Sequence, residues 1–303
     1  MSEGSPKIIF SILTSGQRES LIESLQSIQE LNIPEKRVLL VDGGPRSALP
    51  DTIRKMKLDL IHLQVESDLG IATHRTEGLK HLLTLDFDYV LQLDDDVVLQ
   101  PGCFQRLLAV MEEDPRLGLA APVILDNRGG VLSAGGVYYR HLGQPILFHT
   151  PNPTARSLDF ATGTMGLIRK RALQDTGLMD LRFDPYGFED IDYCLRMRDR
   201  GWAIRLAPDA RCLHVTSYSF HNETVTRLFQ TTAHRLLCAW KFVPGFWFFT
   251  AFLPWYMIRR VAYPVLKFTC MGRIDLAAAV ARGVRHGWRK KRIAPLNPAG
   301  ETS

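Results

Sequence analysis

The sequence predicts an α/β protein with a parallel sheet in its first half and a helical extension at its C-terminal end. Short apolar segments alternate with helical stretches up to about residue 100, which is the pattern of strands joined by crossover helices. The middle of the chain has strand-like segments with few helices between them, and residues 221–303 are rich in aromatic and basic side chains. With 303 residues, of which 46% are apolar, the chain can bury a substantial core.

The first half contains four predicted strands and two predicted helices. We expect strands at 8–13, 37–41, 59–65 and 88–93, and helices at 18–31 and 71–83. Polar residues follow these strands at 14–18, 42–44 and 68–70. Ordinary loops also have this composition, but the carboxyl ends of parallel strands meet at one edge of a sheet, where ligands bind. The repetition therefore predicts a binding crevice at that edge.

The second half has a different pattern. Segments 119–125, 136–140, 158–170, 204–206 and 211–215 are typical of strands, and helices are expected at 101–113 and 189–200. Because few crossover helices separate these strands, this half of the sheet is predicted to be more antiparallel.

Charge and cysteine content restrict the class of protein. The net charge is +5, and the segment 259–292 holds ten Lys and Arg residues against a single acidic residue, Asp275, which favours an anionic surface or ligand. Five cysteines without a Cys-x-x-Cys pair argue against a disulfide framework or structural zinc. The first residues carry no evident secretory signal, so we expect a cytoplasmic protein.

Three consecutive aspartates, Asp94, Asp95 and Asp96, end the predicted strand 88–93. Their mutual repulsion at the tip of a buried strand favours a bound cation, although acidic triplets also occur as solvated turns or helix caps. In a strand, Asp94 and Asp96 would project to one face and Asp95 to the other, which suits a paired set of metal ligands.

The order of motifs resembles that of glycosyltransferase family 2, the inverting, nucleotide-sugar-dependent enzymes of GT-A fold. The resemblance covers about residues 7–220. Its motifs lie at 14–18, 41–44, 68–75, 93–97, 161–164, 187–192 and at His214. The sequence departs from the family pattern at Asp68, where asparagine is more usual, and at 74–76, where His-Arg-Thr replaces an Arg-Asn pair.

The resemblance implies a GT-A domain at 1–220, with a nucleotide-binding half at about 7–100 and an acceptor half at about 101–220. It implies that Asp94 and Asp96, as a DXD motif, together with His214 bind Mn²⁺ or Mg²⁺. Donor and nucleotide contacts are expected from Thr14, Arg18, Asp42, Asp68, Gly70, Arg75, Asp94 and Asp95. Among these, Asp42 can accept the imide N–H of uracil or thymine, and Arg75 can reach a diphosphate unless it is simply a solvated helix residue.

An inverting transfer needs a base that removes the proton of the acceptor hydroxyl. The resemblance assigns this role to Asp190, with Glu189 as acceptor-binding support, although acidic residues are also common at helix starts. Gly163 would let the acceptor or donor sugar approach the backbone, or it is a bulge in a strand.

The segment 242–258 has no charged residue but many aromatic ones, with Pro244 and Pro254 interrupting it. It is short of the roughly 20 residues that a spanning helix needs, and basic residues follow it. We therefore expect residues 221–303 to form a helical extension that docks peripherally on a membrane. A spanning helix and a buried core or oligomer helix are the alternatives. The basic residues 282–292 come without a nucleic-acid recognition motif, so no nucleic-acid partner is expected.

Together these features predict a metal-dependent inverting glycosyltransferase. It would move a sugar from a UDP- or dTDP-sugar to a saccharide or lipid-linked glycan acceptor of the cell envelope, at the inner face of the plasma membrane. The competing hypotheses are a nucleotidyltransferase on a related sheet and a non-catalytic membrane-associated scaffold. The first would attack the α-phosphate of its donor, but the glycine-rich basic loop typical of that class is poorly matched by residues 14–18.

Overall fold

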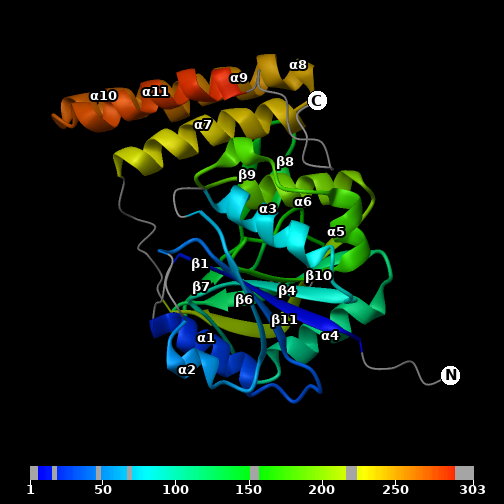
Figure 1. Ribbon diagram of the computed structural model, residues 1–303. Coiled ribbons are helices and arrows are strands. Elements are labelled where there is room, and N and C mark those ends of the chain that lie inside the picture. The colour runs from blue at the N-terminus through cyan, green and yellow to red at the C-terminus, as the bar shows by residue number, and fades with distance from the viewer. Residues whose placement is uncertain are drawn as a thin grey trace.

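The computed structural model describes residues 6–15, 19–45, 49–66, 70–150, 157–215 and 224–290 (Figure 1). In this part of the chain nine strands form one mixed sheet in the order β3-β2-β1-β4-β10-β6-β11-β5, with β7 paired to β6, and a separate hairpin joins β8 and β9. The strands are β1 Ile8–Thr14, β2 Arg37–Asp42, β3 Asp59–Gln64, β4 Tyr89–Asp94, β5 Val97–Leu99, β6 Leu117–Leu125, β7 Val131–Ser133, β8 Gly136–Tyr139, β9 Gln144–Leu147, β10 Met165–Arg169 and β11 Ala203–His214.

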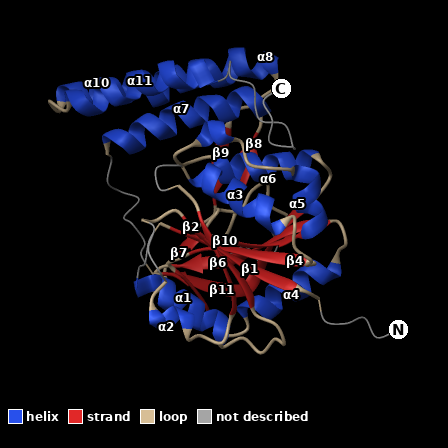
Figure 2. Ribbon diagram, viewed as in Figure 1, coloured by secondary structure: helices blue, strands red, loops and turns tan. Residues whose placement is uncertain are grey.

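Helices cover both faces of this sheet (Figure 2). The helices of the sheet region are α1 Glu19–Gln29, α2 Asp51–Arg54, α3 Ile71–Leu82, α4 Cys103–Glu113, α5 Lys170–Thr176, the short 3₁₀ helix Leu181–Phe183 and α6 Glu189–Asp199. Successive side chains of β1 point to opposite faces of the sheet: Phe10 and Ile12 pack with α1 and α4, whereas Ile9 packs with α3. The predicted mixed α/β sheet is therefore confirmed.

The all-parallel part of the sheet ends at β4; beyond it antiparallel pairs predominate, although β11 is parallel to β6. β1, β2, β3 and β4 are parallel, and β10 runs antiparallel to both β4 and β6. Three predicted strands differ from the structure. Only Met165–Arg169 of the expected 158–170 segment is a strand, and the segments 204–206 and 211–215 belong to one strand, β11, whose register with β6 shifts between Leu206 and Arg211.

A helical layer lies over the α3 and α6 side of the sheet (Figure 1). It consists of α7 Val225–Phe242, then α8 Gly245–Trp247, a π-helical segment Phe248–Phe252, α9 Leu253–Tyr256, a second π-helical segment Met257–Ala262, α10 Tyr263–Cys270, and finally α11 Ile274–Lys290. The segments from α8 to α10 follow one another without a break, so Pro254 does not end the helix as the sequence suggested. Each π-helical segment ends shortly before a proline, Pro254 or Pro264, which has no backbone N–H to donate to the preceding turn.

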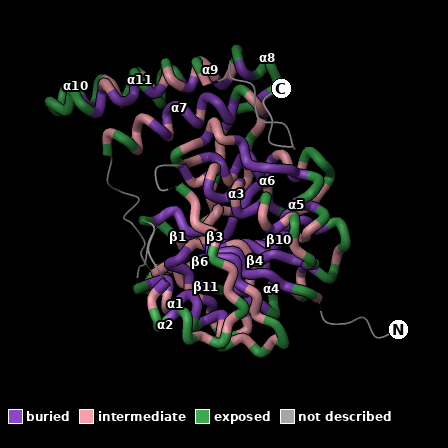
Figure 3. The backbone as a smooth tube through the Cα atoms, in the orientation of Figure 1, coloured by how far each residue is buried: buried purple, intermediate pink, exposed green. Residues whose placement is uncertain are grey.

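Buried and exposed residues alternate along the helices of this layer (Figure 3), and its aromatic residues fall into both groups. Phe248, Phe252 and Tyr256 are buried against α7, whereas Phe246 and Phe249 are exposed by 70% and 56%. The layer is joined to the sheet region through α7, whose Leu237 and Phe242 belong to the same core cluster as α3 and α6. Among the described helices, none has the length and apolar character needed to cross a bilayer.

Candidate active site

The candidate site lies where several strands end at one edge of the sheet. In the register of the sheet, Thr14 at the end of β1 is paired with Asp42 at the end of β2, and Leu13 is paired with Asp94 at the end of β4. Thr14, Asp42 and Asp94 therefore share one edge of the sheet. Two of the predicted crevice residues, Arg18 and Asp68, lie outside the described residues.

Asp94, Asp96 and His214 form a cluster in which one potential ligand atom of each lies within 4.8 Å of the others. His214 arrives there because β11 pairs antiparallel with β5, which places it opposite Val97, and its Nε2 lies 3.1 Å from Oδ1 of Asp96. Two carboxylates and one imidazole are a donor set suited to a divalent ion such as Mn²⁺. The residues present therefore fit the metal that the sequence predicted.

Charge balance in the cluster also favours a cation. Burial raises the pKa of Asp94 to about 6; Arg75 opposes this shift and the neighbouring Asp96 adds to it. Burial lowers the pKa of His214, but the hydrogen bond and charge of Asp96 outweigh that effect, so the pKa is raised overall. Both groups must lose a proton to bind a metal, which ties metal affinity to pH.

Asp95 takes a different direction from its two neighbours. Asp95 and Asp96 lie in a turn between β4 and β5 rather than in a strand, so the predicted alternation of strand faces does not apply there. Nevertheless, Asp94 and Asp96 converge while Asp95 accepts a hydrogen bond of 2.5 Å from Oγ1 of Thr14. Asp95 is only 5% exposed, and this contact joins the ends of β1 and β4.

Arg75 reaches the cluster from α3. Its Nη2 donates to Oδ1 of Asp94 at 3.0 Å and to the carbonyl oxygen of Gly163 at 2.7 Å. The side chain is 5% exposed, so Arg75 is not a solvated helix residue but a buried partner of a candidate metal ligand. Whether it also touches a donor diphosphate stays a prediction.

Gly163 connects this cluster to the candidate base. Its N–H donates to Oδ2 of Asp190 at 3.1 Å, and the N–H of Ile191 donates to Oδ1 of the same carboxylate at 2.8 Å. A Cβ at position 163 would lie 2.2 Å from Nη1 of Arg75, so any other residue there would require the guanidinium to move. The predicted close approach at Gly163 is thus an approach of an arginine, and its contact with a sugar stays untested.

Glu189 and Asp190 begin α6 as expected. Burial raises the pKa of both carboxyl groups; the charge of Asp190 adds to the rise at Glu189, and the N–H of Ile191 opposes it at Asp190. The Oε2 of Glu189 is buried and has no hydrogen-bond partner among the described residues. An unpartnered buried carboxyl oxygen is costly, so this oxygen is a candidate contact for a ligand group.

Asp42 is 3% exposed and its carboxylate is already engaged. Oδ1 accepts from the N–H of Gly44 at 2.8 Å, and Oδ2 lies 3.0 Å from Nε2 of His62. These contacts fix the carboxylate at the end of β2 and leave lone pairs free to accept further hydrogen bonds, so its contact with a nucleobase stays a prediction.

Gly70 serves a purpose that the sequence did not reveal. It precedes α3, and a Cβ there would lie 2.2 Å from Oδ1 of Asp184. That same carboxylate oxygen accepts from the N–H of Ala72 at 2.9 Å, so Asp184 caps the helix that carries Arg75. The position of Gly70 permits this close approach, and its predicted donor contact stays a prediction.

The sequence analysis did not identify three residues that support the candidate site through hydrogen bonds: Asp184, His234 and Lys290. Nζ of Lys290, at the end of α11, donates to the carbonyl oxygen of Asp184 at 2.9 Å and lies 3.1 Å from Nε2 of His234. His234 in turn lies 2.9 Å through Nδ1 from the carbonyl oxygen of Gly187. Because Lys290 sits in a run of basic residues, the sequence offered no signal that this one is turned inward.

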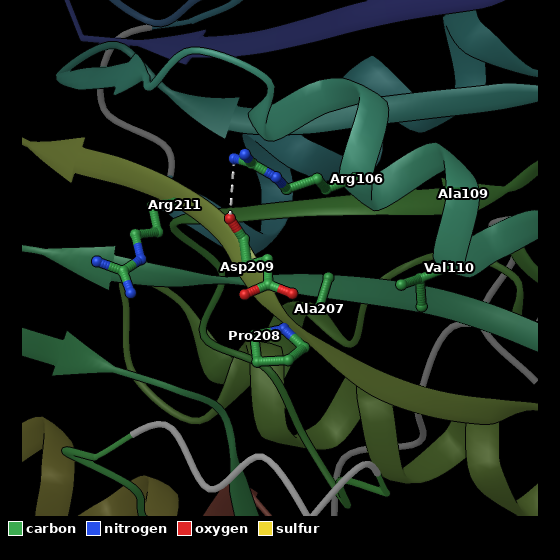
Figure 4. A pocket seen from close by; sticks show the side chains of 7 residues that line it. All are labelled: Arg106, Ala109, Val110, Ala207, Pro208, Asp209 and Arg211. Atoms are coloured by element: carbon green, nitrogen blue, oxygen red, sulfur yellow. Dashed lines mark hydrogen bonds between the residues drawn. The ribbon is translucent and has the colours of Figure 1, made fainter.

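A separate hollow of about 590 Å³ lies between α4 and the register shift of β11 (Figure 4). Nη1 of Arg106 donates to the carbonyl oxygen of Asp209 at 3.1 Å across it. Its lining residues are Arg106, Ala109, Val110, Ala207, Pro208, Asp209 and Arg211. None of the predicted site residues lines this hollow, so it does not enter the account of the active site.

The mixed sheet and the carboxylate–imidazole cluster at its edge define a GT-A fold of the kind found in nucleotide-sugar transferases. The chain belongs to glycosyltransferase-like family 2, whose model matches residues 6–232. The predicted family is therefore confirmed.

Curated relatives and solved structures agree with this family. The chain is 23% identical over 209 residues to poly-β-1,6-N-acetyl-D-glucosamine synthase of Staphylococcus aureus strain COL, a match that covers 68% of this chain and 49% of the relative. The Staphylococcus epidermidis synthase also matches at 23% identity over 209 residues, with the same coverage. The chain thus spans about half the length of these relatives.

Solved glycosyltransferases share the fold at low identity. GalNAc-T7 with UDP, GalNAc and Mn²⁺ has a TM-score of 0.61 at 14% identity, over 88% of this chain and 58% of that one. The mannosyltransferase PcManGT of Pyrobaculum calidifontis, with GDP-Man and Mn²⁺, has a TM-score of 0.57 at 17% identity, over 92% and 75%. S. aureus TarS 1-349 has a TM-score of 0.57 at 16% identity, over 93% and 92%.

Proposed function

We propose that this protein is a metal-dependent inverting glycosyltransferase that moves one sugar from a UDP- or dTDP-sugar to a saccharide or lipid-linked glycan acceptor. The observation that carries the proposal is the chain of contacts from Asp94 through Arg75 and Gly163 to Asp190. It joins a candidate metal cluster to a candidate base through three hydrogen bonds, and transfer between two bound substrates requires such fixed relative positions.

On the donor side, Asp94, Asp96 and His214 would hold Mn²⁺ or Mg²⁺. The ion, when bound, offsets the charge that develops on the departing nucleoside diphosphate. Thr14, Asp95 and Asp42 lie along the same edge and would bind the nucleoside, with Asp42 accepting the imide N–H of a uracil or thymine. The neighbouring structures with UDP or GDP-Man and Mn²⁺ support a donor of this class.

On the acceptor side, Asp190 would remove the proton from the attacking hydroxyl. Two backbone N–H groups orient its carboxylate, and its raised pKa makes it a stronger base than an exposed aspartate. Attack from the face opposite the leaving group inverts the anomeric centre. Glu189, with its unpartnered Oε2, would bind a second hydroxyl of the acceptor and orient it.

The chain would work as a GT-A domain at about 1–220 with a helical extension at 221–303 on the inner face of the plasma membrane. The exposed Phe246 and Phe249 and the basic residues that follow them support peripheral membrane contact. The curated relatives named as polysaccharide synthases support an acceptor of the cell envelope.

Product analysis tests the proposal directly. The full chain with Mn²⁺ is first screened by thermal stabilisation against a panel of UDP-, dTDP- and GDP-sugars, because a bound donor raises the melting temperature. The stabilising donor is then incubated with saccharide and lipid-linked acceptors. Release of nucleoside diphosphate together with an inverted glycoside is the expected result. Pyrophosphate release would instead identify a nucleotidyltransferase, and absence of any metal-dependent nucleotide binding would favour a non-catalytic scaffold.

A further inference from the structure

The helical layer contains a basic pocket separate from the candidate active site. It has a volume of about 620 Å³ and lies between α7, the start of β9 and the continuous helix from α8 to α10, Gly245 to Cys270, which we call the long helix. Five of its lining residues are cationic and none is acidic: Arg227, Arg235, Arg259, Arg260 and Lys267. A pocket of this size suits a small ligand, and its charge calls for an anion.

Among the described residues, three of these arginines have no carboxylate partner. Arg235, Arg259 and Arg260 form no ion pair with any acidic side chain in the part of the chain that the structure describes. Their described contacts are with aromatic faces instead: Arg259 lies 5.7 Å from the ring of Tyr263, and Arg260 lies 5.6 Å from that of Trp255. Ring faces orient a guanidinium but leave its charge and most N–H groups available.

Arg235 is the innermost of the three. Its Nη1 is buried and has no hydrogen-bond partner among the described residues, and the Oε1 of Gln144 in the same pocket is likewise unpartnered. Burial, and then the charge of Arg260, lower the pKa of Arg235 to about 10. A buried guanidinium beside like charges is costly without an anion, and a phosphate offers the oxygen acceptors that would satisfy it.

The surroundings of the pocket are apolar and exposed. On the same long helix, Met257, Ile258 and Leu266 are exposed by 42%, 63% and 65%, beside the aromatic rings of Trp255 and Tyr263. A soluble anion would need no such surface, whereas a lipid brings apolar chains together with its phosphate. Aromatic residues beside basic ones are typical of a membrane interface.

We propose that this pocket binds the phosphate of an anionic lipid, with the arginines around the phosphate and the lipid chains along the exposed apolar side of the long helix. This proposal does not depend on the glycosyl-transfer activity. It nevertheless places the lipid near the acceptor side of the candidate site, because the guanidinium of Arg235 also lies 5.2 Å from the ring of Phe188, the residue before Glu189.

Vesicle binding by the full chain tests the proposal. The vesicles are phosphatidylcholine with and without phosphatidic acid, whose phosphomonoester presents the free oxygens that the arginines would bind. The double variant R259Q/R260Q removes two exposed pocket charges, and R282Q/R285Q removes two exposed charges of α11 that do not line the pocket. Arg235→Gln probes the buried charge, and the exposed double variant carries the test should Arg235→Gln fail to fold.

We expect R259Q/R260Q to weaken binding to phosphatidic acid vesicles about tenfold or more, while R282Q/R285Q changes it by less than about threefold. If both double variants lost vesicle binding equally, diffuse surface charge would account for the binding, and the proposal of a lipid site in the pocket would be wrong. Equal binding to both kinds of vesicle would mean apolar contact alone. Inorganic pyrophosphate is tested in solution as well: if it bound with the same arginine dependence while vesicles showed no preference, the ligand would be a soluble anion and the lipid assignment would be wrong.

Discussion

The backbone N–H of Gly163 donates a hydrogen bond of 3.1 Å to the carboxylate of Asp190, the candidate base. The carbonyl oxygen of the same glycine accepts from Arg75, which in turn contacts Asp94 of the metal cluster. Gly163 therefore contacts both Arg75 on the donor side and Asp190 on the acceptor side of the candidate site.

Gly163→Ala is expected to lower kcat by roughly a hundredfold. The new methyl group would meet Nη1 of Arg75 at 2.2 Å, so the guanidinium must move away from Asp94, and displacements of this size in a catalytic group cost about that factor. Overpacking should also reduce the free energy of unfolding by about 1–3 kcal/mol. Gly245→Ala is the matched control, because nothing lies within 4 Å of its added carbon. Steady-state kinetics and chemical denaturation measure both effects, and wild-type kcat in Gly163→Ala would refute the connection.

Asp190→Asn should reduce kcat by about 10²- to 10⁴-fold, because an amide cannot accept the hydroxyl proton. Donor binding in the presence of Mn²⁺ should be nearly unchanged, since Asp190 lies on the acceptor side. The control is Asp199→Asn at the exposed end of α6. Single-turnover kinetics separates the chemical step from binding. If Asp190→Asn transferred sugar at the wild-type rate, another group would have to be the base.

Asp96→Ala should abolish the stabilisation that Mn²⁺ and a nucleoside diphosphate together give to the wild-type chain. The variant removes one of three candidate ligands and also the partner that orients His214. The exposed Asp209→Ala is the control, because it removes a carboxylate that lies outside the cluster. Calorimetric titration with MnCl₂ gives the comparison, and an unchanged affinity in Asp96→Ala would place the metal elsewhere.

Metal affinity should increase as the pH rises from about 5.5 to 8. Asp94 has a pKa of about 6 and His214 a pKa above its usual value, so both hold protons at the lower pH that Mn²⁺ must displace. The sign follows from the linkage: the metal-free state binds more protons than the metal-bound state, so raising the pH favours binding. Titrations at several pH values with proton-release measurements test this. A metal affinity that falls over this range would contradict the assignment of Asp94 and His214 as ligands.

Lys290→Met should lower kcat by about threefold to tenfold without removing any group that touches substrate. Lys290 donates to the carbonyl oxygen of Asp184, and Asp184 caps the helix that carries Arg75. Loss of these hydrogen bonds should also cost about 1–2 kcal/mol of stability. Arg289→Met, an exposed neighbour on α11, is the control. Hydrogen exchange at the amides of Ala72 and Thr73 should increase in Lys290→Met alone, and equal exchange in the two variants would argue against the support role.

The sequence predicted most of the donor edge of the site. Strand periodicity located the ends of β1, β2 and β4, and the acidic motif with His214 identified three residues that the fold brings within 4.8 Å. Such signals are local, because alternation and strand-end polarity are properties of short segments. They cannot reveal contacts between distant segments, such as Arg75 with Gly163, which lie 88 residues apart.

The acceptor half and the helical layer were predicted less well. The strand expected at 158–170 is mostly loop before Met165, because Phe160 makes only an isolated bridge to Gly136. The long helix passes through Pro254 by means of π-helical turns, which propensity alone does not foresee. The inward turn of Lys290 depends on packing between α7 and α11, which no local pattern encodes.

The contacts of Lys290 with Asp184 and His234 affect where the chain can be shortened at its C-terminal side. The family match stops at residue 232, in the middle of α7, which runs to Phe242. A fragment cut at that limit would keep every candidate ligand and base yet lose the lysine and half of the helix beneath it. Low activity of such a fragment would reflect the lost contacts of Lys290 and α7, and it could be mistaken for a missing cofactor or a wrong donor.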